Sequence, residues 1–122
     1  MKSSVLVVED DEEVLKVTLE MLTTLGYQAV AASNGTEAIQ ILKSDQKFDL
    51  LFSDIMMPRG ITGVELAREA KQHCNGIKIL LTSGNAEDVL ARYGAVGEFP
   101  VIGKPFLRAE LAQCLKLVMH GQ

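Results

Sequence analysis

Acidic, hydroxyl and ammonium side chains follow several short apolar runs of this sequence, each at the point where the run ends. Glu9 and Asp10 follow the first run, and Asp54 follows a later one. Carboxylates gathered in one place repel each other unless a hard divalent cation sits among their oxygens, and Mg²⁺ suits one or two carboxylates plus waters. If the fold brings these residues together, they predict a magnesium site.

The same set of side chains could support phosphoryl transfer. A carboxylate can attack phosphorus to form an aspartyl phosphate, provided that metal, ammonium and hydroxyl groups match the charge on the phosphoryl oxygens. Thr82 and Lys104 follow two further apolar runs and supply the hydroxyl and the ammonium group. The chemistry therefore depends on whether one fold places all four runs side by side.

The apolar runs predict five β-strands. Residues 5–8 form an unbroken run of Val and Leu that is typical of a strand buried on both faces of a parallel sheet. The other strands are predicted at residues 29–32, 49–52, 77–81 and 99–102. Segments with helical spacing are predicted at residues 12–25, 36–43, 64–72, 86–93 and 107–119.

Strands that alternate with helices through short connections predict an α/β fold with a doubly wound, five-stranded parallel sheet and five helices. In the flavodoxin-like strand order 2-1-3-4-5, ligands bind beyond the carboxyl ends of the strands, between the first and the third strand. All the residues named above would then share one edge of the sheet.

The overall composition favours one domain and a protein partner. The chain has 122 residues, which is a common size for a single domain, so we expect one domain over residues 1–122. A net charge of −4 disfavours binding to nucleic acid or to an anionic membrane. Since no apolar run is long enough for a signal peptide or a membrane span, we expect a cytoplasmic protein.

Four short motifs at the predicted strand ends resemble the receiver domain of bacterial response regulators. They are VVEDD at 7–11, FSDIMMP at 52–58, LTSG at 81–84 and KPF at 104–106. Each motif alone is weak, but four in the family's order make coincidence a poor explanation. The resemblance covers essentially the whole chain and is greatest to receivers of hybrid sensor histidine kinases and to stand-alone receivers.

The resemblance implies a role for each residue of the site. It makes Asp54 the phosphoacceptor, with Thr82 and Lys104 in contact with the phosphoryl oxygens. The implied Mg²⁺ ligands are Asp54, Asp10, Glu9 through a water molecule, and the main-chain carbonyl of Met56. It also implies a cis peptide bond between Lys104 and Pro105.

The implied function is that of a switch in a two-component system or phosphorelay. A histidine kinase or a histidine phosphotransfer protein would donate the phosphoryl group. The receiver would then relay it or change its surface at the fourth helix, fifth strand and fifth helix, as a monomer or a weak dimer. It would not be an enzyme in the usual sense, because it catalyses only its own phosphorylation and dephosphorylation.

Two features depart from the usual receiver pattern. Many receivers have Tyr or Phe three residues before the lysine, but this chain has Val101 there. Phe99 lies two residues earlier, and side-chain alternation predicts that it shares a sheet face with Val101 and could replace the aromatic residue. The loop at 57–63 is also one residue longer than the usual form.

Three alternatives give weaker accounts of the same residues. A degenerate receiver that only binds partners would normally lack the Asp, the Lys or the acidic pair, and all are present. A phosphatase of the haloacid dehalogenase class requires Asp-x-Asp, whereas Ile55 and Met56 follow Asp54. An FMN carrier needs a phosphate-binding loop after the first strand, where Glu9 and Asp10 would repel the phosphate.

Overall fold

A computed structural model describes residues 2–57, 60–85 and 94–120 of the chain. Five parallel strands form one sheet in the order β2-β1-β3-β4-β5, as the sequence predicts. The strands are β1 (Ser4–Val8), β2 (Gln28–Ala32), β3 (Leu50–Asp54), β4 (Lys78–Ser83) and β5 (Val101–Gly103).

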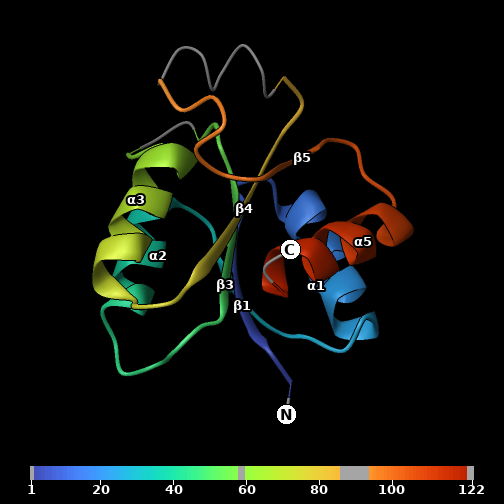
Figure 1. The fold of residues 1–122 in the computed structure, drawn as a ribbon, viewed down its shortest axis with the longest axis horizontal. Coiled ribbons are helices and arrows are strands. Elements are labelled where there is room, and N and C mark those ends of the chain that lie inside the picture. The colour runs from blue at the N-terminus through green and yellow to red at the C-terminus, as the bar shows by residue number, and fades with distance from the viewer. Residues whose placement is uncertain (1, 58–59, 86–93, 121–122) are drawn as a thin grey trace.

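Helices cover both faces of the sheet (Figure 1). The described helices are α1 (Glu12–Thr24), α2 (Gly35–Leu42), α3 (Gly63–His73) and α5 (Arg108–Met119). In Figure 1, α2 and α3 lie on one face and α1 and α5 on the other. The helix predicted at 86–93 lies outside the described residues. Within the described ranges, no helix has both the length and the apolar character needed to cross a bilayer.

The hydrophobic core is divided by the sheet into two clusters. Successive side chains of a strand point to opposite faces, so each buried strand contributes to both clusters. On β1, Leu6 packs with α2 and α3, whereas Val5 and Val7 pack with α1 and α5. This division decides the face to which the polar residues at the strand ends point.

Side chains cap the starts of α1, α2 and α3, whereas α5 begins after Leu107 without a side-chain cap. Asp11 caps α1, since its Oδ1 accepts hydrogen bonds from the backbone N–H groups of Glu13 at 3.0 Å and Val14 at 3.2 Å. Thr62 and Glu65 form a capping box at the start of α3. Capping of α1 therefore accounts for the acidic side chain of Asp11.

The strands differ from the predicted ranges at their carboxyl ends. Both β3 and β4 extend two residues beyond their apolar runs, so that Asp54 pairs with Thr82 inside the sheet. Backbone hydrogen bonding continues where side-chain hydrophobicity stops, and a pattern based on side chains misses this extension. By contrast, β5 begins at Val101, two residues later than predicted, because Pro100 has no N–H group to donate to the ladder.

Candidate functional site

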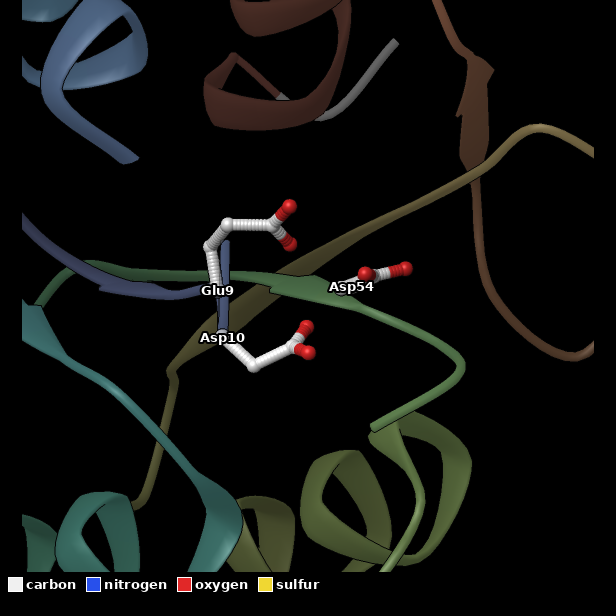
Figure 2. A group of neighbouring side chains, drawn as sticks. All are labelled: Glu9, Asp10 and Asp54. Carbon is white, nitrogen blue, oxygen red and sulfur yellow. The ribbon is translucent and has the colours of Figure 1, made fainter. Parts of the chain in front are cut away.

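Three carboxylates meet at the carboxyl edge of the sheet. One oxygen from each of Glu9, Asp10 and Asp54 lies within 4.8 Å of the others. Figure 2 shows Glu9 and Asp10 on consecutive residues beyond β1, beside Asp54 at the end of β3. Glu9 and Asp54 are buried, with 4% and 7% of their surfaces exposed, whereas Asp10 is exposed.

Strand alternation explains why the buried polar side chains point to one face. Each lies two residues beyond an apolar residue that packs toward α1 and α5. The pairs are Val7 and Glu9, Phe52 and Asp54, and Leu80 and Thr82. Glu9, Asp54 and Thr82 therefore continue the α1–α5 side of the core to the edge of the sheet.

Lys104 joins two of the carboxylates. Its Nζ donates to Glu9 Oε1 at 2.8 Å and to Asp54 Oδ2 at 3.1 Å. The main chain places it there by extending the last strand, because the N–H of Lys104 donates to the carbonyl of Ser83 at 3.0 Å. The peptide bond between Lys104 and Pro105 is cis, as the resemblance implies.

The electrostatics of this cluster are dominated by burial of the charges. Burial and the adjacent carboxyl group of Asp54 raise the pKa of Glu9 to about 7, although Lys104 acts in the opposite direction. Burial alone would lower the pKa of Lys104, but its contacts with Glu9 and Asp54 raise that pKa above the ordinary value. The single ammonium group of Lys104 therefore neutralises only part of the negative charge of the Glu9 and Asp54 carboxylates.

Two buried oxygen atoms of the site have no hydrogen-bond partner among the described residues. They are Glu9 Oε2 and Thr82 Oγ1. Both residues line a small cavity of about 10 Å³, together with Lys104. Leaving a buried polar atom unpaired costs about 1–3 kcal/mol. A hard cation for the carboxylate oxygens and a phosphoryl oxygen for the hydroxyl would satisfy these atoms, so the residues fit Mg²⁺ and a phosphoryl group.

An apolar groove opens beside the carboxylates, between α1 and the segment after β5. Its volume is about 530 Å³, and Val14, Val17, Met21 and Phe106 contribute much of its lining. Val17 is half exposed, and Lys104 lines both the groove and the small cavity. The groove therefore adjoins the chemical site directly.

The structure brings together Glu9, Asp10, Asp54, Thr82 and Lys104, all of them predicted from the sequence. Met56, the sixth predicted residue, lies two positions beyond Asp54 and is 42% exposed.

The sequence did not predict the ion pair between Lys104 and Glu9. The only signal for it was the opposite charge of two residues that follow β1 and β5 at the same edge of the sheet. Phe99 and Val101, predicted to share a face, both pack against the core on the α2–α3 side, although Phe99 precedes β5.

The chain is similar to several known proteins. It is 34% identical to the sensor kinase CckA of Brucella abortus, over 98% of this chain and 13% of the kinase. It covers about half of other curated relatives, which are transcriptional regulatory proteins. A response regulator receiver protein from Sinorhizobium medicae superposes with a TM-score of 0.87 at 28% identity, covering 98% of this chain and 95% of that chain.

A second solved structure bears on the metal site. The receiver domain of the sensor histidine kinase PA1611 from Pseudomonas aeruginosa, which has a magnesium ion coordinated in its active site cleft, has a TM-score of 0.84 at 27% identity. The alignment covers 98% of this chain and 99% of that chain. The family model for the response regulator receiver domain matches residues 5–116. With the fold and the acidic edge, this match shows that the chain belongs to the response regulator receiver domain family.

Proposed function

We propose that this chain is a phosphoacceptor receiver in which Asp54 takes a phosphoryl group from a phosphohistidine in a Mg²⁺-dependent reaction. The observation that carries the proposal is the surroundings of Asp54. Its carboxylate lies 3.1 Å from the Lys104 ammonium group, beside two further carboxylates, and its strand neighbour Thr82 has an unpaired buried hydroxyl.

The proposed transfer requires only a nucleophile and groups that balance charge. An oxygen of Asp54 forms a bond to phosphorus while the bond from phosphorus to the donor imidazole breaks, and the imidazole keeps the electron pair. Lys104 then balances negative charge on the phosphoryl oxygens, and Thr82 Oγ donates a hydrogen bond to one of them. Bound Mg²⁺ would neutralise further charge on these oxygens.

Glu9, Asp10, Asp54 and the main-chain carbonyl of Met56 are the proposed metal ligands, with Glu9 acting through water. The carboxylates are hard oxygen donors on one edge of the sheet, which suits Mg²⁺ rather than a softer metal. The receiver domain of PA1611, which has a coordinated magnesium ion, supports this identity for the metal.

A protein is the proposed phosphoryl donor, either a histidine kinase or a histidine phosphotransfer protein. The apolar groove between α1 and residues 104–106 supports this, because it opens beside Lys104 and offers buried contact area to a macromolecule. Such donors and this receiver would meet in the cytoplasm. The receiver would then relay the group or change its surface around β5 and α5, without acting as an enzyme on other substrates.

Intact-mass measurement after incubation with acetyl phosphate tests the proposal. The wild type should gain one phosphoryl group when Mg²⁺ is present and none when it is removed with a chelator. Asp54→Asn should gain none under either condition. Asp49→Asn is the matched control, since this aspartate lies just before the same strand at the opposite edge of the sheet, and it should behave like the wild type. Labelling of Asp54→Asn, or no labelling of the wild type, would refute the proposed role.

A further inference from the structure

The start of α3 lies directly against the backbone of the proposed phosphoacceptor. Gly63, the first residue of α3, donates its N–H to the carbonyl of Ile55 at 2.8 Å. A Cβ atom at Gly63 would overlap the carbonyl oxygen of Asp54 and would lie 2.8 Å from Ile55 Cα. These are main-chain atoms of β3 and its exit, so no side-chain rotation could relieve the overlap.

The start of α2 makes a similar approach to the loop that precedes α3. A Cβ atom at Gly35 would lie 2.6 Å from Ile61 Cγ1 and 3.4 Å from the carbonyl oxygen of Ile61. Ile61 lies two residues before Gly63 and is partly buried against the core on this side of the sheet. The two helix starts therefore contact both ends of the connection between β3 and α3.

Space, not backbone conformation, requires glycine at these two positions. Neither Gly35 nor Gly63 is among the glycines with positive φ, so alanine could adopt either backbone conformation. Gly103, beside Lys104, also has no positive φ, and nothing lies within 4 Å of a Cβ built there. Gly103 thus offers a control that is near the site but has free space.

We propose that Gly63 and Gly35 are positioning residues for the metal site: by lacking a Cβ they let α3 and α2 hold the main chain at and after Asp54. The proposal rests on the proposed function, because the groups so positioned are the Asp54 carboxylate and the Met56 carbonyl. In Figure 2 Asp54 lies at the end of β3, beside Glu9 and Asp10. A shift of the main chain at Asp54 and Met56 would displace ligands that Mg²⁺ requires in a strict geometry.

Magnesium affinity of the purified chain tests the proposal without phosphorylation. Mg²⁺ is titrated into wild type, Gly63→Ala and Gly103→Ala while amide chemical shifts are followed by NMR. Gly63→Ala should bind Mg²⁺ at least tenfold more weakly than the wild type, whereas Gly103→Ala should bind normally. Exchange of the Ile55 N–H, which bonds to the carbonyl of Thr82 at 3.0 Å, should become faster only in Gly63→Ala.

A stability control separates positioning from a general loss of folding. Ala70 is fully buried in the interior of α3, and Ala70→Gly should destabilise the same helix by about 1 kcal/mol without touching Asp54. This variant should melt at a lower temperature and bind Mg²⁺ like the wild type. If Gly63→Ala instead binds Mg²⁺ as well as Ala70→Gly does, the glycine is merely structural and the proposal is wrong.

The contact at α2 allows a rescue experiment that decides the question even if Gly63→Ala does not fold. Gly35→Ala should weaken Mg²⁺ binding about threefold, and adding Ile61→Ala should restore it, because this change removes the Cγ1 atom that the new Cβ meets. If the wild type binds Mg²⁺ and neither Gly35→Ala nor the double variant Gly35→Ala/Ile61→Ala changes that affinity, the proposal is wrong. Failure of the wild type to bind Mg²⁺ would instead overturn the proposed metal site itself.

Discussion

Polar side chains are exposed at the amino edge of the sheet but largely buried at its carboxyl edge. At the amino edge, Asp49 Oδ2 accepts a hydrogen bond from the N–H of Ser4 at 2.8 Å, and Lys78 is exposed to solvent. At the carboxyl edge, most of the buried polar side chains of the described residues gather. They are Glu9, Ser53, Asp54, Thr82 and Ser83, and the buried Thr18 of α1 lines the small cavity beside them.

The difference lies in how completely these groups are paired. The polar groups of the amino edge reach solvent or a local partner, so they cost little stability. At the carboxyl edge two buried oxygens have no partner and two carboxylates share one ammonium group. Such an arrangement lowers stability, and sites of this kind are where function is usually found. Incomplete pairing of buried polar groups, rather than the number of charged residues, therefore distinguishes the candidate site from the opposite edge of the sheet.

The largest predicted effect comes from removing the shared cation. Lys104→Met leaves Glu9 and Asp54 without their ammonium partner, so at pH 8 without Mg²⁺ the free energy of unfolding should fall by about 2–3 kcal/mol. Phosphorylation by acetyl phosphate should slow by at least about a hundredfold. Urea denaturation and intact-mass kinetics measure the two effects. Unchanged stability would mean that the two carboxylates are not crowded in solution.

The second prediction concerns pH. The folded-state pKa of Glu9, about 7, lies above its ordinary value of 4.5, so the folded chain binds more protons than the unfolded chain between these values. Without Mg²⁺, stability should therefore fall as the pH rises from about 4.5 through 7, by at most about 3 kcal/mol from this group.

Urea denaturation of wild type and Glu9→Gln at several pH values between 5 and 8 tests this slope. The variant has no carboxyl group at this position and should show a flatter profile. Since Mg²⁺ binds the ionised carboxylates, adding it should stabilise the wild type more at pH 8 than at pH 5.5. Parallel profiles for the two proteins would contradict the raised pKa.

A third prediction uses the unpaired hydroxyl. Thr82→Val replaces a buried Oγ that has no partner with a methyl group of similar size. The variant should be more stable by about 1 kcal/mol, because a desolvated polar group is removed. It should also accept phosphate from acetyl phosphate about tenfold more slowly. A loss of stability would show that the hydroxyl is paired in solution.

The smallest effect is expected at the opposite edge. Asp49→Ala removes the acceptor for the N–H of Ser4 and should lower the free energy of unfolding by about 1 kcal/mol. Phosphate uptake and Mg²⁺ affinity should remain those of the wild type. If this variant impaired phosphorylation, the two edges would not be functionally distinct.

The sequence predicted the sheet and the grouping of polar residues at its carboxyl edge because both depend on simple patterns. Five apolar runs that alternate with helical segments predict a doubly wound parallel sheet, and parallel strands bring residues that follow them to one edge. Glu9, Asp54 and Thr82 could therefore be placed at a common edge from the sequence alone. The extension of β3 through Asp54 was missed, because side-chain hydrophobicity does not report backbone pairing.

Other features depend on distances that no sequence pattern expresses. Nothing in the residue types around Gly63 indicates that its Cα approaches the main chain of Asp54 too closely for a side chain. The double contact of Lys104 with Glu9 and Asp54 depends on the direction of β5, which begins later than its apolar run. These details follow from how the elements pack, and packing is decided by the whole chain.

The ion pairs of Lys104 also have a consequence for the newly made chain. Lys104 is separated from Glu9 by 95 positions and from Asp54 by 50, so the carboxylates leave the ribosome well before the ammonium group that compensates them. A nascent chain that has not yet added β5 would carry the acidic side chains without the ammonium group of Lys104. The charges of the carboxyl edge can therefore be paired only after β5 and Lys104 have been made.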